Sequence, residues 1–422
     1  MLISLDSACL NDLRCQSHSP KSKLIPIMTD RAQKMNRRQR QKFVGTALGL
    51  ALLVVASGAT ARTQSQSFET ALSKDRPLLD LDLRSYGYKP RSAGRLDFLS
   101  LGFADADHVL FGWTTVDRSN GDKKIGPLTP APSHLHALIF DIRSGQKENN
   151  HDWPTATFLA TISSVDENKF LICTGDAIEL LSRNFDLFRE QALSRFGPCN
   201  ADNLSPSRRS FSIDTGRGRQ FQRSVLNADT FHPIATWSSE AANVHFTDTL
   251  LAGNCKPDFE PCIREFTGRW HPLERPIVDP HQSDSRYQNL GFADDSTVVF
   301  GTGSGIMGVT PQGSLEFRID LQKTHYVGAI ATSVRGERFA FLDIKMHGSE
   351  ALDMQFPSDE NVVVYSLRQK TTIYARKVKG VMWSWLPLVD RRCQFALSPD
   401  GNLLAIVDDG TLAVYQLPVP KS

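Results

Sequence analysis

Two histidines and two tryptophans stand out because the members of each pair are two residues apart. His134 and His136 would lie on one face of a strand, which is the simplest way for a sequence to offer two metal ligands. Trp383 and Trp385 would direct both indole rings to one side and form a stacking surface for a sugar, a quinone or a protein. The alternatives are a solvated or buried histidine pair and tryptophans that pack in the interior. We name these four residues as candidate ligand-binding residues.

Catalytic motifs are missing from the sequence. It contains neither an H-E-x-x-H zinc motif nor a G-x-S-x-G nucleophile elbow. The glycines at 301, 303 and 305 follow a predicted strand, but no helix follows them, so tight turns explain them better than a phosphate loop does. We therefore assign no catalytic residue and no metal ligand, and we predict no cofactor.

A hydrophobic segment near the N-terminus has the pattern of an export signal. Four basic residues within positions 37–42 precede residues 43–59, which carry no charge. The segment ends in Ala59-Thr60-Ala61, a small-x-small triplet suited to signal peptidase. We predict cleavage after Ala61 and a periplasmic or extracellular location. The alternative is an uncleaved membrane anchor, because about 17 apolar residues are at the lower limit for spanning a bilayer.

Processing would change the sign of the net charge. The full chain has 48 basic and 46 acidic residues, a formal charge of +2. Residues 1–61 hold nine of the basic and three of the acidic residues, so the remainder has a formal charge of −4. A mildly acidic protein lacks the cationic surface that phosphate neutralisation requires, which argues against nucleic acid as the partner.

Five cysteines remain after the predicted cleavage, at positions 173, 199, 255, 262 and 393. An exported protein can form disulfides. Cys255 and Cys262 bracket a proline-containing loop whose ends could come within bridging distance, so we predict that they are bonded, the alternative being two free buried thiols. Cys173 and Cys199 form a less specified second pair, and one cysteine must stay unpaired.

Short internal repeats carry the prediction of the fold. L-G-F-A-D at 101–105, followed by V-L-F-G at 109–112, matches L-G-F-A-D at 290–294, followed by V-V-F-G at 298–301. L-S-P-S-R-R-S-F at 204–211 matches L-S-P-D-G-N-L-L at 397–404. Each repeat is an apolar strand, a polar turn and another apolar strand, so it predicts a duplicated hairpin.

Looser repeats extend the series to seven turns, near residues 106, 166, 207, 248, 294, 335 and 400. Most spacings are close to the ~40–45 residues of a four-stranded propeller blade. Residues 116–133 and 346–361 account for the two longer spacings and read as inserted loops. The S-P-D-G turn at 398–401 resembles that of exported bacterial β-propeller repeat proteins of the YVTN and TolB-like kinds, and of tryptophan-aspartate-repeat propellers. The resemblance spans about residues 77–418.

We therefore predict an all-β protein, a β-propeller of seven blades, with six or eight as alternatives. An open strand edge invites pairing with other chains, so residues 77–84 should close the last blade by pairing with residues 411–417. The expected domains are an extension without native structure (1–34), the signal (35–61), a flexible linker (62–76), the propeller (77–418) and a tail (419–422).

Propellers support many functions, so the fold alone does not settle this one. We expect an exported binding or scaffolding module, without enzymatic activity, for an unidentified ligand or protein. The inserted loops would form its recognition edge. The alternative is a hydrolase, lactonase or quinoprotein-like oxidoreductase with a site in the central channel, which would require convergence among His134, His136, His232, His245 and the aspartates of the turns. Those aspartates could also hold a structural or channel-bound cation or simply form Asx turns. We expect a monomer that contacts a membrane only if the leader is retained.

Overall fold

The computed structural model describes most of the chain beyond residue 72. The described residues are 73–90, 99–116, 133–155, 160–166, 168–175, 177–192, 196–215, 222–238, 241–256, 260–273, 288–302, 305–321, 325–335, 337–349, 354–379 and 393–419. The chain separates into two units, residues 1–65 and 66–422, and every described residue belongs to the second. The predicted export signal and the tryptophan pair Trp383 and Trp385 lie outside the described residues. Within the described part, no helix combines the length and hydropathy needed to span a bilayer.

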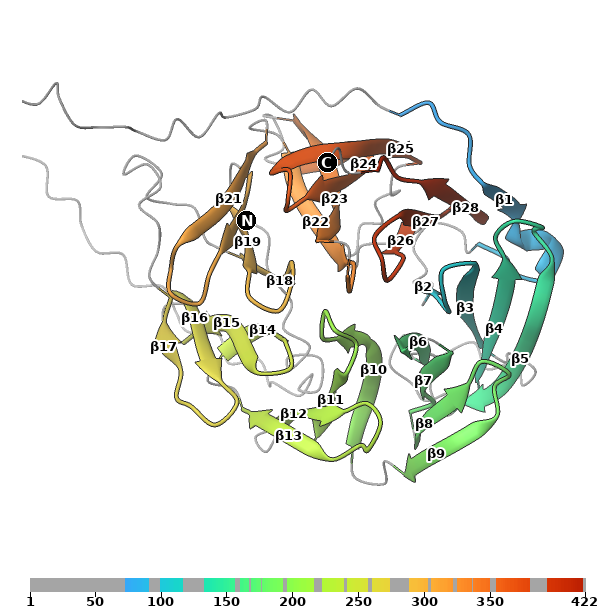
Figure 1. Cartoon of the computed structure of the whole chain (residues 1–422), viewed down its shortest axis with the longest axis horizontal. Helices are drawn as coiled ribbons and strands as arrows, with labels where there is room; N and C mark the ends of the chain where they lie inside the picture. Colours follow the sequence, from blue (N-terminus) through green and yellow to red (C-terminus); the bar gives the residue numbers. More distant parts are fainter. Residues whose placement is uncertain are drawn as a thin grey trace, which may run out of the picture. The chain divides into compact units, whose positions relative to one another are not determined.

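The second unit is a ring of seven four-stranded antiparallel sheets (Figure 1). Strands that follow one another along the chain are neighbours in six sheets, and the seventh also takes in the first strand of the unit. The chain is therefore an all-β protein with the architecture of a seven-bladed β-propeller, as the repeats predict.

The strands of the first four blades have the following bounds. Blade 1 consists of β2 (Leu99–Phe103), β3 (His108–Val116), β4 (Ser133–Asp141) and β5 (Lys147–Thr155), and blade 2 of β6 (Thr161–Asp166), β7 (Lys169–Cys173), β8 (Ala177–Ser182) and β9 (Leu187–Ala192). Blade 3 consists of β10 (Phe196–Leu204), β11 (Ser210–Thr215), β12 (Gln222–Asn227) and β13 (Pro233–Trp237), and blade 4 of β14 (Ala241–Phe246), β15 (Leu250–Cys255), β16 (Glu260–Glu265) and β17 (His271–Pro272).

The last three blades complete the ring. Blade 5 consists of β18 (Gln288–Phe292), β19 (Val298–Thr302), β20 (Gly305–Val309) and β21 (Leu315–Asp320), and blade 6 of β22 (His325–Thr332), β23 (Arg338–Ser349), β24 (Met354–Ser366) and β25 (Thr371–Val378). Blade 7 consists of β26 (Cys393–Leu397), β27 (Leu403–Asp408), β28 (Thr411–Gln416) and β1 (Leu79–Asp82).

The N-terminal strand closes the ring as predicted. β1 pairs antiparallel with β28, in a register that runs from Leu79 opposite Val414 to Asp82 opposite Thr411. The strand is shorter than the predicted segment, because residues 83–86 form a 3-10 helix, η2 (Leu83–Tyr86). The Asp82 side chain accepts a hydrogen bond from the Arg84 backbone N–H at the start of this helix, and Gly87 ends it with a φ of 96°.

The seven predicted turns all occur, and each joins the first two strands of a blade. Because consecutive strands are antiparallel, these turns lie on one face of the ring, which we call the turn face. In blades 1 to 6, the connections between the third and fourth strands lie on the same face for the same reason. The repeat detected in the sequence is thus the blade itself.

The hydrophobic core lies between blades. The described residues form seven buried clusters, and each cluster joins two neighbouring blades, including blades 7 and 1. In β3, Leu110 packs toward blade 2, whereas Val109 and Phe111 pack toward blade 7. Successive strand residues point to opposite faces, so both faces of a blade can be apolar without exposing either.

The prediction that residues 346–361 form a loop is wrong. β23 and β24 continue through most of this segment as a long hairpin, with Met346 opposite Pro357 and Ser349 opposite Met354. Pro357 lies in the part of β24 beyond the end of its pairing with β25, where proline is tolerated because no third strand needs its N–H. Polar composition therefore does not exclude a strand here. Of the other predicted loop, residues 117–132 lie outside the described residues.

Candidate functional site

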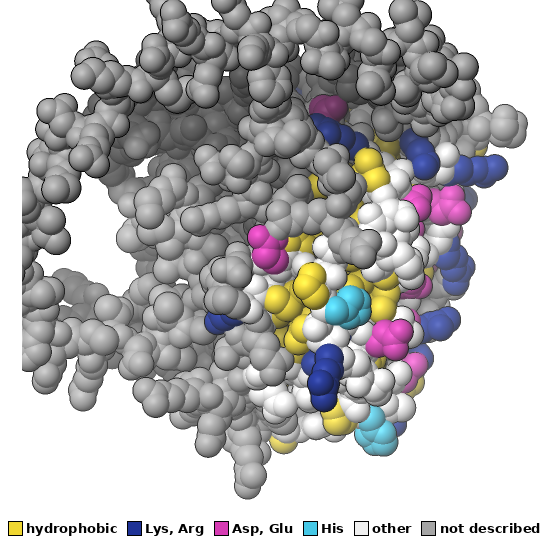
Figure 2. Space-filling view, turned by 90° about the vertical axis from the view of Figure 1, so that its left-hand side faces the viewer, with side chains coloured by type: hydrophobic (Ala, Val, Ile, Leu, Met, Phe, Trp, Pro, Cys, Tyr) yellow, Lys and Arg dark blue, Asp and Glu magenta, His cyan; other side chains and the backbone are white. Residues whose placement is uncertain are grey.

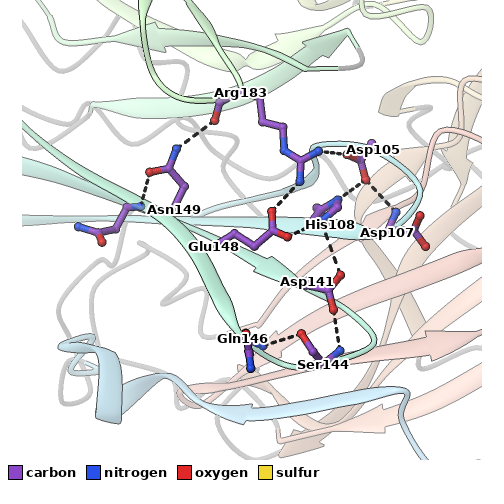
Figure 3. Close-up of polar contacts among 10 residues, drawn as sticks. Asp105, Asp107, His108, Asp141, Ser144, Gln146, Glu148, Asn149 and Arg183 are labelled. Atoms are coloured by element: carbon purple, nitrogen blue, oxygen red, sulfur yellow. Dashed lines mark hydrogen bonds and ion pairs between the residues drawn. The ribbon is translucent and has the colours of Figure 1, made fainter.

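One histidine, three carboxylates and one arginine meet on the turn face where blades 1 and 2 adjoin (Figure 3). Asp105 and His108 come from the turn between β2 and β3 and from the first residue of β3. Asp141 ends β4 and Glu148 lies near the start of β5. Arg183 comes from the turn between β8 and β9 of blade 2. We call these five residues the blade 1–2 cluster.

His108 is the centre of the cluster. Its Nδ1 is 2.6 Å from Asp105 Oδ1, and its Nε2 is 3.1 Å from Glu148 Oε1 and 3.6 Å from Asp141 Oδ2. Only 12% of its side chain is exposed. One possible ligand atom each from His108, Asp141 and Glu148 lie within 4.8 Å of one another. Three potential metal donors therefore converge at this point.

The surrounding contacts orient these donors. Arg183 Nη1 donates to Asp105 Oδ2 at 3.0 Å, and Arg183 Nη2 donates to Glu148 Oε2 at 2.6 Å. The Asp107 backbone N–H donates to Asp105 Oδ1 at 2.8 Å. The backbone carbonyl of Arg183 accepts a hydrogen bond from the Asn149 side chain at 3.2 Å, which anchors the arginine against β5 (Figure 3).

Asp141 is held in its ionised form. The side chain and the backbone N–H of Ser144 both hydrogen-bond to it and lower the pKa of its carboxyl group. The backbone N–H of Ser144 donates to Asp141 Oδ1 at 2.6 Å, which leaves Oδ2 directed at His108. A carboxylate with one oxygen fixed and the other directed inward is a suitable metal ligand.

The chemistry of this donor set suits a divalent cation such as Zn²⁺. An imidazole Nε2 and two carboxylates are ligands that zinc accepts, and a histidine whose Nδ1 contacts a carboxylate is the usual outer support of a ligating histidine. Tetrahedral coordination with bonds of about 2.1 Å needs donor atoms about 3.4 Å apart. The distances from His108 Nε2 to Glu148 Oε1 and Asp141 Oδ2, 3.1 and 3.6 Å, are close to this value.

His134 and His136 project from the same face of β4, as their spacing predicts, but they do not form a metal site with a third ligand among the described residues. Their ring centroids are 6.3 Å apart. Both nitrogens of His136 are engaged, Nδ1 at 2.6 Å from Asp152 Oδ1 and Nε2 at 2.8 Å from Thr115 Oγ1. The His136 ring also stacks on Trp113 at 4.8 Å. These contacts hold the imidazole ring of His136, which lies on β4, between side chains of β3 and β5.

The other two histidines that a central-channel enzyme site would require, His232 and His245, belong to blades 3 and 4 and lie apart from the blade 1–2 cluster. His232 is exposed beside β13 in blade 3, and His245 is on β14, the innermost strand of blade 4. Burial, with a smaller contribution from the charge of Arg223, lowers the pKa of His245 to about 4. The histidine that does join turn-face carboxylates is His108, which the sequence analysis did not single out.

Two further tryptophans are buried and do not form a stacking surface. Trp113 packs between blades 7 and 1, and Trp237 between blades 3 and 4. Cys255 and Cys262 form a disulfide across the β15–β16 hairpin, with their Cα atoms 5.8 Å apart. Cys173 is also disulfide-bonded, and Cys393 is free and buried.

The internal repeat contained the signal that would have identified His108. In the matched L-G-F-A-D hairpins, His108 aligns with Thr297. Thr297 is buried and its hydroxyl donates to Asp294, the counterpart of Asp105. A threonine is therefore enough to hydrogen-bond the aspartate of this turn. The histidine at the same place in blade 1 is not needed to form the turn. Glu148 had no comparable signal, because it comes from an exposed outer strand.

Comparisons with known proteins assign no family to this chain. No protein-family model matches the sequence, and no curated protein matches it. Among solved structures, the chain is similar to the oligogalacturonate lyase of Vibrio parahaemolyticus, with 11% identity over 78% of this chain and 90% of that one and a TM-score of 0.47. It is also similar to BamB from Moraxella catarrhalis, with 14% identity over 77% and 87% of the two chains and a TM-score of 0.38. The C-terminal WD40 domain of Sif2 gives 10% identity over 78% and 98%, with a TM-score of 0.39.

Proposed function

We propose that this protein is an exported binding or scaffolding propeller that holds a divalent cation at the blade 1–2 cluster. The observation that carries the proposal is the convergence of His108, Asp141 and Glu148. The cation would join the β2–β3 and β4–β5 turns of blade 1 and present open coordination positions on the turn face. A partner or ligand with an oxygen donor would complete its coordination.

The charges of the cluster support a cation. Asp105, Asp141 and Glu148 contribute three carboxylates, and among the described residues Arg183 is the permanent cation in direct contact with them. When His108 is neutral, the cluster has an excess of two negative charges. A proton on His108 offsets one of them, and a divalent metal would offset both. Metal and proton therefore compete for Nε2, so affinity should fall as the pH is lowered.

Export is the second part of the proposal. The signal-like residues 35–61 and the disulfide-bonded state of Cys173, Cys255 and Cys262 support this part, because disulfides form and persist in an oxidising compartment. Among the coloured side chains in Figure 2, which belong to the described residues, Lys and Arg are interspersed with Asp and Glu and form no continuous cationic area. Such a surface suits a protein or small-molecule partner better than nucleic acid.

Calorimetric titration with ZnCl₂ tests the cation site, with MgCl₂ and CaCl₂ as comparisons, on protein freed of metal with EDTA. His108→Thr is the informative variant, because it installs the residue found in the matched blade 5 turn and should preserve folding. We expect wild-type protein to bind one Zn²⁺ per chain and His108→Thr to bind at least tenfold more weakly, since outer contacts alone change metal affinity by about 10–100-fold. His232→Ala, which removes an exposed histidine, is the control and should bind as wild type does. Equal zinc affinity in wild type and His108→Thr would refute the proposal.

A further inference from the structure

A single arginine joins blades 3 and 7 on the turn face. Arg208 lies in the turn between β10 and β11, and its Nη2 donates to the backbone carbonyl of Leu397, the last residue of β26, at 3.3 Å. Two whole blades separate blades 3 and 7 along the shorter path around the ring. The side chain therefore crosses the middle of the ring, where the innermost strands of the blades face one another (Figure 1).

The backbone of Arg208 has a conformation that favours glycine. Its φ is 62°, in the left-handed region. In the matched turn of blade 7 the equivalent residue is Gly401, with a φ of 72°. A residue with a Cβ in this region carries a cost of about 1–2 kcal/mol relative to the ordinary right-handed conformation. Glycine would build the same turn without that cost, so the fold itself does not explain an arginine here.

The turn that carries Arg208 is held rigidly by its neighbours. Asp248, from the equivalent turn of blade 4, accepts hydrogen bonds from Ser207 Oγ at 2.6 Å and Ser210 Oγ at 2.9 Å. The Arg208 backbone N–H donates to the Ser205 carbonyl at 2.9 Å. The backbone that carries the guanidinium is thus held in place by hydrogen bonds, which reduces the entropy lost when the guanidinium binds a ligand.

The guanidinium has no counter-ion among the described residues. Its contact there is the neutral Leu397 carbonyl, which uses one of its five N–H donors. Burial lowers the pKa of Arg208 to about 10, so the group is still protonated at neutral pH. A half-buried cation without an anion is unfavourable, and a bound anion would remove that penalty.

We propose that Arg208 binds a small oxyanion, the carboxylate or phosphate group of a ligand, at the centre of the turn face. The planar fork of a guanidinium matches both groups through paired hydrogen bonds. Acidic residues also lie on this face: the charges of Asp248 and Asp294 both act on Asp295, and the charge of Arg209 opposes them. Their presence favours an anion of low charge over a polyanion. The site is separate from the blade 1–2 cluster and does not depend on a metal there.

Titration of the purified protein in EDTA tests the inference while the cation site is kept empty. One series uses inorganic phosphate and the other malonate, so the two sources of the oxyanion are distinguished. The variants are Arg208→Gly, which copies the blade 7 turn, and Arg209→Gln, which removes the adjacent exposed cation and serves as the control. Binding is measured by calorimetry, and the melting temperature is measured with and without each anion.

We expect at least one anion to bind wild type and Arg209→Gln, and to bind Arg208→Gly at least tenfold more weakly, as the loss of a charge-assisted hydrogen bond predicts. Without anion, Arg208→Gly should melt at the wild-type temperature or above it, because the variant removes both the backbone cost and the uncompensated charge. A lower melting temperature would instead make Arg208 a structural cross-link and overturn the inference. So would equal anion affinity in wild type and Arg208→Gly, or no binding of either anion to wild type.

Discussion

Acidification should destabilise the ring through His245. This residue lies on β14, the innermost strand of blade 4, and its ring faces β18 of blade 5. A Cβ placed on Gly291 of β18 would be 3.5 Å from His245 Nδ1. Burial lowers its pKa from 6.5 to about 4. Between these pH values the unfolded chain binds a proton at His245 and the folded chain does not. The contribution to stability is therefore complete above about pH 6.5 and is lost as the pH falls toward 4.

The size of the effect follows from the two pKa values. Each tenfold change in proton affinity corresponds to about 1.4 kcal/mol, so the shift from 6.5 to about 4 sets an upper limit of about 3 kcal/mol. His245 is partly accessible, and solvent screening should reduce the observed value below this limit.

Urea unfolding of wild type and His245→Gln, at about pH 7.5, 6 and 5, measures the contribution of His245 to the pH dependence of the free energy of unfolding. Glutamine remains neutral over the whole range, so the variant should lose less stability on acidification than wild type does. Burial raises the pKa of Asp295, Asp343 and Asp408, which act in the opposite direction, but they are common to both proteins and cancel in the comparison. Parallel stability profiles for the two proteins, or an NMR titration of the His245 ring with a midpoint near 6.5, would refute the reasoning.

Two further predictions concern packing. Leu83→Ala should lower the free energy of unfolding by about 2–5 kcal/mol, since Leu83 is completely buried in the core between blades 7 and 1 and follows the closing strand. Chemical denaturation measures this loss, and a change below about 1 kcal/mol would contradict the role assigned to that segment. Gly308→Ala should destabilise the protein by about 1–3 kcal/mol, because its Cβ would lie 2.0 Å from the Phe317 ring. Gly102→Ala is its control, since the nearest atom to the added Cβ is Ser164 Cβ at 3.8 Å, and its melting temperature should change less.

The architecture was predictable because a propeller repeats its local pattern. Each hairpin needs an apolar strand, a turn with suitable backbone conformation and a second apolar strand, and these requirements recur within about 40–45 residues. That periodicity identified all seven turns, and the need to cover an open strand edge identified the closing strand. It failed for residues 346–361, because the long β23–β24 hairpin has the polar composition and the turn-forming residues that are typical of loops.

The sites depended on tertiary structure. His108, Glu148 and Arg183 are far apart in sequence and meet only because the ends of antiparallel strands from two blades share one face. Arg208 meets Leu397 only because the ring closes. The sequence alone determined the blades, through local propensity and hydrophobic alternation. Which polar side chains come together was decided by the radial packing of those blades, since the distance between two turns around a ring is not encoded within either one.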